Sequence, residues 1–408
     1  MEKVINVMWL CSKPTNEYLE KLNKTNIHYG GWIDSILSVI KKSKKIHIDY
    51  VFFVNDKNNY KEIKTNDVNY YPVRNYDEAN KILKQNHMLH VFGTENKKIN
   101  QFVLKNDNNN IVVWLQGLLS EYNYYYYGIN EVIKKSKISN ALITKFIIFI
   151  NYRLYRLRSK GEINVLKKVK YVIGRTDWDK KISLSINPNL TYFYFQEVLR
   201  ECFYNKKLWK NKILKPHSIY ISQANYPIKG FHNVIRPLSK VKEKYPDLTI
   251  RISGENILNS NNKLTNLGIN YAGLIKKLLK KYDLLDSVQF LGTINSEKVK
   301  KELLNNNIFL LCSNIENSPN SFGEALMTGT PIVSVDVGGI GSLADNKIVH
   351  YYSDEESLIK QIESIFDHKI PSTKVLKQRN KATHNYNKKQ ILKDLENIYK
   401  SILKEKYE

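Results

Sequence analysis

The sequence predicts an α/β protein built from two doubly wound domains. Short apolar runs that are typical of buried strands alternate with amphipathic helical patterns along the whole chain. The alternation stops at a lysine-rich stretch, 206–215, and begins again at residue 218. A chain of 408 residues also exceeds what one compact core accommodates and suits two domains of about 200 residues each.

The first half contains six apolar runs, each followed by polar or glycine-rich residues that are typical of loops. The expected strands are 4–10, 46–54, 67–73, 87–92, 110–115 and 172–176. The expected helices are 33–40, 77–85 and 141–158. Strands that alternate with helices favour a parallel sheet covered on both faces.

The second half repeats this organisation. The expected strands are 218–223, 248–253, 288–291, 308–312, 331–335 and 348–352. The expected helices are 234–238, 274–282, 297–304, 322–327, 356–366 and 388–404. We therefore expect an N-terminal domain at 1–205, a C-terminal domain at 206–385, and a last helix within 386–408 that packs back on the N-terminal domain, with a cleft between the two domains.

The charge balance indicates an anionic partner. The chain has a net charge of +25 and a pI near 9.5, which suits nucleic acid, anionic lipid or a nucleotide-bearing substrate. A general lysine and asparagine bias explains the same numbers. None of the usual nucleic-acid recognition motifs is present, so we expect no nucleic-acid partner.

Cysteine usage and hydropathy indicate a reducing compartment. Three scattered cysteines, Cys11, Cys202 and Cys312, fit neither a disulfide framework nor a zinc site. The apolar segment 146–150 is far shorter than the ~20 residues of a membrane span. No secretory signal is evident at the start. We expect a cytoplasmic protein that could also contact the inner face of the cell membrane.

Three further segments each have two interpretations. The basic amphipathic stretch 141–158 could lie on an anionic membrane or pack on a domain core. The aromatic cluster 121–127 could form contacts, by stacking on sugar rings or by sitting in an interface, or could form a partly buried loop. The pair Asp177 and Asp179 could hold a metal ion or open a helix, where acids are favoured; we expect no metal site.

The stretch 308–341 organises the second half as strand, loop, helix and strand. In a parallel sheet such loops meet at the carboxyl edge, where ligands bind. Glu316 lies in the loop and Glu324 in the first turn of the helix, so both acids could face one crevice. Ser321 and Glu324 also match a capping box, in which the acid would serve only the helix start.

Phosphate-binding features occur in both halves. Gly30 and Gly31 precede a helix, where backbone N–H groups suit an anion. Lys229 beside Gly230 offers a full positive charge in the second half. Carboxylates suit the hydroxyl pairs of a ribose or sugar because each accepts two hydrogen bonds. Together these features indicate a nucleotide-sugar.

The motif Glu316-(seven residues)-Glu324, followed by Gly329-x-Pro331 and Gly338-Gly339, resembles the E-x7-E signature of retaining glycosyltransferase family 4, which has the GT-B fold. The segments 174–179 and 197–200 are similar to a bacterial subgroup that acts in surface-polysaccharide assembly. The resemblance implies a GT-B protein with two Rossmann-like domains facing a cleft, and transfer with retention that needs no bound metal.

The resemblance also implies roles for individual residues. Glu324 would bind the ribose, and Glu316 would hold the donor sugar. Lys229 would neutralise the departing diphosphate, and Gly31 of the Gly30-Gly31 loop would contribute a backbone amide to it. Backbone amides of the helix start would assist; its residues are Asn320, Ser321, Phe322 and Gly323.

The chain departs from the family pattern at two positions. Gln223 stands where many members have an arginine that assists the lysine. Gln116 stands where many members have a histidine that contacts the donor sugar. Either Gln116 or His90 could take over that contact with the sugar.

We therefore expect a glycosyltransferase that uses a nucleotide-diphosphate sugar, with UDP expected in preference to GDP, and a glycan or lipid-linked acceptor. It would act in the synthesis of a surface polysaccharide such as capsule or O-antigen. The alternatives are a non-catalytic GT-B partner protein and a GT-B enzyme that resembles phosphorylases.

Overall fold

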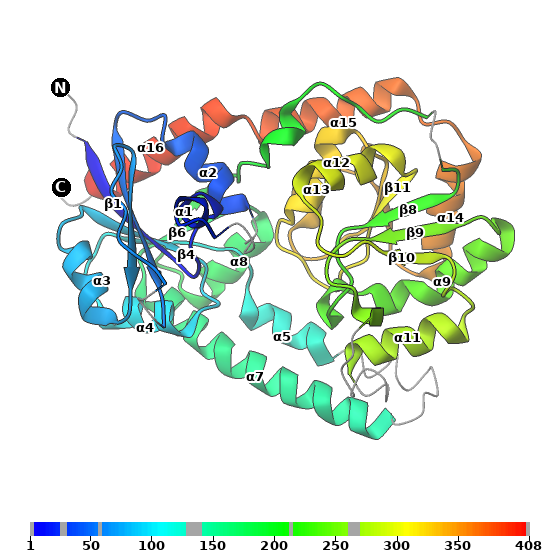
Figure 1. Cartoon of the computed structure of the whole chain (residues 1–408), viewed down its shortest axis with the longest axis horizontal. Coiled ribbons are helices and arrows are strands. Elements are labelled where there is room, and N and C mark those ends of the chain that lie inside the picture. Colours follow the sequence, from blue (N-terminus) through cyan, green and yellow to red (C-terminus); the bar gives the residue numbers. More distant parts are fainter. Residues whose placement is uncertain are drawn as a thin grey trace. The chain divides into compact units, whose positions relative to one another are not determined.

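The computed structural model describes residues 4–24, 31–55, 59–127, 141–211, 215–259 and 270–404. The chain divides into two compact units (Figure 1). Unit 1 comprises residues 1–120, 157–200 and 385–408, and unit 2 comprises residues 121–156 and 201–384. The expected N-terminal domain, 1–205, included residues 121–156, whereas the structure groups these residues with unit 2.

Unit 1 contains a seven-stranded parallel sheet in the order β3-β2-β1-β4-β5-β6-β7. Its strands are β1 (Ile5–Cys11), β2 (Ile46–Phe53), β3 (Val68–Val73), β4 (Met88–Phe92), β5 (Ile111–Trp114), β6 (Tyr171–Gly174) and β7 (Thr191–Tyr194). The central strands β1, β4 and β5 are buried along almost their whole length, which explains their continuous apolar sequences.

Helices cover the faces of this sheet. They are α1 (Asn16–Lys21), α2 (Trp32–Ile40), α3 (Tyr76–Leu83), α4 (Lys97–Lys105), α8 (Asp177–Ile186) and α16 (Lys388–Lys404). Two more helices, α5 (Leu119–Tyr127) and α7 (Ala141–Lys168), include the residues at which the units divide. The aromatic stretch 121–127 is thus helical, and the interpretation of it as a loop is wrong.

The C-terminal helix α16 returns to unit 1 and lies beside α2 (Figure 1). Its buried face includes Leu395 and Tyr399. Ser43 Oγ, just after α2, donates a hydrogen bond to Glu396 Oε1 at 2.6 Å. The apolar face of this amphipathic helix therefore packs against unit 1 and forms part of its core.

Unit 2 contains a six-stranded parallel sheet in the order β10-β9-β8-β11-β12-β13. Its strands are β8 (Ser218–Ile221), β9 (Thr249–Ile252), β10 (Val288–Phe290), β11 (Ile308–Leu311), β12 (Ile332–Val335) and β13 (His350–Tyr352). Its α-helices are α9 (Phe231–Lys244), α11 (Tyr271–Lys281), α12 (Ser296–Asn305), α13 (Asn320–Thr328), α14 (Glu355–Asp367) and α15 (Ser372–Asn385). Its 3-10 helices are η1 (Glu201–Tyr204), η2 (Pro227–Lys229), η3 (Ile257–Asn259) and η4 (Ile340–Ser342).

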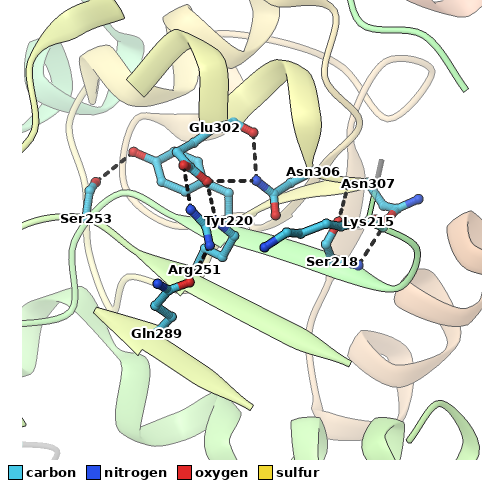
Figure 2. Close-up of polar contacts among 9 residues, drawn as sticks. All are labelled: Lys215, Ser218, Tyr220, Arg251, Ser253, Gln289, Glu302, Asn306 and Asn307. Carbon is cyan, nitrogen blue, oxygen red and sulfur yellow. Dashed lines mark hydrogen bonds and ion pairs between the residues drawn. The ribbon is translucent and has the colours of Figure 1, made fainter. Parts of the chain in front are cut away.

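Polar contacts tie helix α12 to one half of this sheet (Figure 2). Arg251 of β9 donates two hydrogen bonds to the Glu302 carboxylate of α12. Its Nε lies 2.5 Å from Oε2, and its Nη2 lies 2.8 Å from Oε1. Arg251 Nη1 also donates to Gln289 Oε1 of β10. The Tyr220 hydroxyl meets Ser253 Oγ at 2.7 Å. The Tyr220 contact joins the end of β9 to β8, the strand that leads into the loop carrying Lys229.

Among the described residues, no helix combines the length and the apolar character that a membrane span requires.

Candidate functional site

The candidate site of unit 2 lies where two adjacent strands end. β8 leads into the loop that carries Lys229, and β11 leads into the loop that carries Glu316. Lys229 Nζ lies 2.6 Å from Glu316 Oε1. Ser313 Oγ donates to the same carboxylate oxygen at 2.7 Å. The side chains of Lys229 and Glu316 are 17% and 8% exposed, so the pair is largely shielded from solvent.

The environment keeps the lysine charged. Burial opposes the charged amine, but Glu316 and Tyr226 outweigh burial, and the pKa of Lys229 is raised above its ordinary value. Lys229 Nζ lies 5.7 Å from the centre of the Tyr226 ring, within the range of a cation–π contact. Tyr226 and Ser313 did not enter the sequence prediction, although both are polar residues in the two loops that carry Lys229 and Glu316.

Glycines allow these loops to approach each other. Gly230 has φ +68°, and a Cβ there would collide with the carbonyl oxygen of Cys312. Gly338 has φ +58°, and a Cβ there would collide with the carbonyl oxygen of Glu316. The Gly339 N–H donates to that same Glu316 carbonyl at 2.9 Å. Backbone contacts therefore hold Glu316 in place independently of its carboxylate.

Helix α13 begins next to this loop without a side-chain cap. Its N-cap is Pro319, which forms no side-chain capping hydrogen bond. Ser321 is the second helical residue and Glu324 the fifth, so the capping-box interpretation of these two residues is wrong. The amino-terminal amides at Asn320 and Ser321 lie in the region of the helix that favours an anion.

The remaining residues predicted for unit 2 lie on the same loop and helix, or on a loop beside them. Phe322, Gly323 and Glu324 are buried in the first turns of α13, with Glu324 only 2% exposed. Gln223 is exposed in the loop after β8. The structure thus brings Lys229, Glu316 and the start of α13 into one carboxyl-edge region of the second sheet.

In unit 1, Gln116 lies at the carboxyl end of β5. Its carbonyl oxygen accepts a hydrogen bond from Arg175 Nη2 at 2.9 Å. The next residue, Gly117, donates its N–H to Glu95 Oε1 at 3.0 Å. Arg175 also pairs with Glu197, and these two side chains are 4% and 3% exposed. The buried ion pair therefore supports the backbone of the loop that carries Gln116.

His90 has a structural position in the core of unit 1. It is 0% exposed on β4. Its Nδ1 lies 2.6 Å from the Tyr399 hydroxyl, which also accepts a 2.9 Å hydrogen bond from Trp9 Nε1. Since the tyrosine oxygen accepts from Trp9, its own proton is available to His90 Nδ1. Burial lowers the pKa of His90 to about 3. The structure therefore gives His90 no face toward a sugar.

The glycines predicted near the first helix are only partly described. Gly30 lies outside the described residues. Gly31 is the N-cap of α2, with φ −76° and no side-chain cap on the helix. A Cβ at Gly31 would meet nothing within 4 Å, so no steric contact in the described structure requires glycine there.

The acids of segment 174–179 have roles within unit 1. Asp179 and Thr176 form a capping box at the start of α8. Asp179 also accepts the Arg175 N–H at 3.0 Å. Asp177 accepts a hydrogen bond from the Tyr194 hydroxyl. These contacts favour the helix-opening interpretation of the acids over a metal site.

Solved structures resemble this chain over nearly its whole length. Sucrose-phosphate synthase from Thermosynechococcus elongatus is 13% identical, with a TM-score of 0.65 over 98% of this chain and 99% of the other. Anabaena Alr3699/HepE, solved with UDP and glucose, is 11% identical, with a TM-score of 0.64 over 97% and 100%. A glycosyltransferase from Rickettsia africae ESF-5 is 15% identical, with a TM-score of 0.63 over 98% and 99%. This is the GT-B fold. The predicted fold class is confirmed.

Sequence comparison points to the same part of the GT-B chain as the site geometry. Residues 205–389 match the family described as Glycosyl transferases group 1. A phosphatidylinositol N-acetylglucosaminyltransferase subunit from Arabidopsis thaliana is 22% identical over an alignment of 275 residues that covers 63% of this chain. The match spans 57% of that relative. The matched family segment contains Lys229, Glu316 and Glu324.

Proposed function

We propose that this protein is a retaining glycosyltransferase that moves a sugar from a nucleotide-diphosphate sugar to a glycan or lipid-linked acceptor. The observation that carries the proposal is the shielded Lys229–Glu316 pair beside the uncapped start of α13. A cation and free helix amides form a site for a diphosphate, and carboxylates form a site for hydroxyl groups. The match of this segment to group 1 glycosyl transferases supports the proposal.

Each donor group has a proposed partner in unit 2. The diphosphate would meet Lys229 and the first amides of α13, and the ribose hydroxyls would meet Glu324. The transferred sugar would lie against Glu316. A fixed cation and fixed dipoles lower the barrier because they are already oriented toward the charge that develops on the leaving diphosphate. Protein groups supply that positive charge, so we propose a reaction without a metal ion.

Donor binding would exchange one partner of the lysine for another. Without donor, Lys229 is paired with Glu316. A diphosphate carries more negative charge than one carboxylate, so it would draw the lysine away and release Glu316 to accept hydrogen bonds from the sugar. Ser313 would keep the released carboxylate in place through its 2.7 Å hydrogen bond. The ion pair is thus the resting form of the donor site.

The nucleotide and the pathway are further parts of the proposal. HepE was solved with UDP and glucose and with UDP-glucose, which supports a UDP-sugar donor here. The similarity of segments 174–179 and 197–200 to surface-polysaccharide enzymes supports a capsule or O-antigen type of product. Gln116 remains the candidate for contact with the sugar, and Gly31 for contact with the diphosphate.

A donor screen tests the proposed function. The full chain would be heated in the presence of a panel of nucleotides and inorganic phosphate, and stabilisation by UDP or GDP is expected. Release of UDP from UDP-sugars would then be followed with and without a membrane extract as acceptor source. Acceptor-dependent release supports the proposal. Absence of all nucleotide binding would indicate a non-catalytic protein, and stabilisation by phosphate alone would indicate a phosphorylase-like enzyme.

A further inference from the structure

Helix α7 carries a row of exposed large apolar side chains among its described residues. Its exposed large apolar side chains are between 42% and 80% accessible. They are Leu142, Phe146, Phe149, Ile150, Leu154 and Leu157. A soluble surface tolerates such side chains singly, but a continuous row of them marks an interaction surface.

The spacing of these residues places them along one side of the helix. Successive members are separated by three or four positions, apart from the adjacent pair Phe149 and Ile150, as expected for one face of an α-helix. From Leu142 to Leu157 the row is about 22 Å long at 1.5 Å per residue. The opposite side carries Asn151, Tyr152 and Tyr155, which are only partly exposed, and beyond the row it continues to the buried residues Ser159 and Glu162. The helix therefore has an inner and an outer face, and the outer face is apolar.

Positive charge accompanies the outer face. Residues 141–161 contain five cationic side chains and no Asp or Glu. The cations are Lys145, Arg153, Arg156, Arg158 and Lys160. Arg153 lies within the apolar row, with its guanidinium 6.0 Å from the centre of the Phe149 ring. A long arginine side chain can lie along apolar groups while its charge reaches a polar layer.

We propose that the outer face of α7, defined by the six apolar residues from Leu142 to Leu157 and their flanking cations, docks on the surface of an anionic lipid bilayer. Apolar side chains would enter the boundary between headgroups and acyl chains, while Lys and Arg side chains would meet lipid phosphates. A protein partner would need to supply a long apolar groove lined with acids. A bilayer supplies both properties at once, and it matches a helix that lacks acidic residues over its first 21 positions.

The inner face of the same helix connects this surface to the donor loop of unit 2. Tyr155 is only partly exposed. It is close enough to Tyr226 to add to the rise in the pKa of Tyr226 that burial causes. Tyr226 in turn packs against Lys229. If the proposed function holds, docking through α7 would place the lipid surface on the side of the helix opposite the donor loop, which suits a lipid-linked acceptor.

Vesicle co-sedimentation of the full chain tests the docking surface. The vesicles would contain phosphatidylcholine alone, or phosphatidylcholine with about one third phosphatidylglycerol. The wild-type chain is expected to bind the anionic vesicles at least about tenfold more tightly than the neutral ones. The triple variant Leu142→Ser, Phe146→Ser and Leu154→Ser is expected to lose at least about tenfold of that binding.

A matched control replaces two exposed leucines of unit 2 outside α7, Leu285→Ser and Leu376→Ser, which are 39% and 49% exposed. This control should bind vesicles like the wild type. Unchanged binding of the triple variant, or equal binding to both kinds of vesicle, would overturn the proposal. A wild-type dimer that the triple variant converts to monomer would also overturn it, because the face would then belong to a second copy of the chain.

A separate measurement distinguishes failure of this inference from failure of the proposed function. Stabilisation by UDP would be measured for the wild type and the triple variant without vesicles. The altered residues lie on the outer face, so UDP stabilisation should be equal in both. Lost vesicle binding with intact UDP stabilisation supports the docking surface specifically. Equal loss of both would show that the variant perturbs the fold and would contradict the assignment of these side chains to an exposed face.

Discussion

Lys229 Nζ and Glu316 Oε1 lie 2.6 Å apart although 87 positions separate the two residues in the chain. The contact joins the loops that follow two adjacent parallel strands, β8 and β11. Both charges are largely shielded from water, so each depends on the other for compensation. The same two residues therefore contribute to the stability of unit 2 and to the proposed donor chemistry.

Replacing one member of this pair should affect stability and activity differently from replacing both. Lys229→Met leaves the Glu316 carboxylate buried without its cation, and the free energy of unfolding should fall by about 3 kcal/mol. The double variant Lys229→Met with Glu316→Gln removes both charges and should regain most of that loss. Denaturant titration of the variants measures the difference.

Transfer activity provides the control for this comparison. Neither variant has the cation that faces the leaving diphosphate, so both should lose about 10²–10³-fold in kcat. A double variant that is stable but inactive separates the catalytic role of Lys229 from its structural role. Recovery of activity together with stability would show that the lysine serves only the fold.

The contact between His90 and Tyr399 predicts a pH dependence of stability. The pKa of His90 is about 3 in the fold and about 6.5 in the unfolded chain. Below pH 6.5 the unfolded state therefore binds a proton that the folded state excludes. The His90 contribution is complete above pH 6.5 and should decline by about 1.4 kcal/mol per pH unit as the pH falls toward 3.

The variant His90→Gln isolates this contribution, because an amide oxygen can still accept from the Tyr399 hydroxyl. Its unfolding free energy should depend less steeply on pH between 6.5 and 4 than that of the wild type. His232, whose pKa burial also lowers to about 3, is present in both proteins and cancels from the comparison. Equal slopes would refute a neutral, buried His90. The donor KM should be the same in both proteins.

Two glycines predicted near phosphates should respond differently to alanine. Gly230 has φ +68° and no room for a Cβ beside the Cys312 carbonyl, so Gly230→Ala should lower the unfolding free energy by about 3 kcal/mol. Gly31 has φ −76° and open space around its Cα, so Gly31→Ala should change stability by less than about 0.5 kcal/mol. Thermal or denaturant unfolding of both variants measures the contrast, and equal effects would contradict the described loop geometry.

Replacing Arg175 should change the KM for the sugar donor, because Arg175 supports the loop that carries Gln116. Arg175→Lys keeps a positive charge beside Glu197 but lacks the planar fork that also reaches the Gln116 carbonyl. We expect a rise of about tenfold in the KM for the sugar donor, with a smaller fall in kcat, because the loop loses one hydrogen bond to a charged group. Unchanged KM in a normally folded variant would remove Gln116 from the list of sugar contacts.

The sequence predicts the helices and strands that a short stretch of consecutive residues specifies. The stretch 308–341 contains β11, α13 and β12 in the predicted order, because each is a short apolar run or a helix that ends at a glycine. Helix α4 was not predicted, although Asn96 caps it and Ile99, Phe102 and Val103 form its buried face. Strand β7 was also missed, although its sequence Thr191–Tyr194 is rich in aromatic residues that favour strands; its residues are mostly half-exposed.

The site could be predicted only in part. Glu316, Glu324 and Lys229 follow from a motif and from residue chemistry, but the direct pairing of Lys229 with Glu316 depends on the adjacency of β8 and β11. The role of His90 depends on Tyr399, which is 309 positions away. No local pattern contains such a contact, because it arises only when α16 returns to unit 1. Likewise, the sequence alone does not show which face of α7 is exposed, because that depends on how the rest of the helix packs.

The variant Glu316→Gln tests the central claim most directly, because it removes the carboxylate charge with almost no change in shape. UDP binding and acceptor-dependent release of UDP from a UDP-sugar would be measured side by side for the variant and the wild type. We predict that the variant still binds UDP at least as tightly as the wild type, because Lys229 no longer has a competing carboxylate, while UDP release falls by about 10²–10³-fold. Full release activity in Glu316→Gln would contradict the assignment of this site.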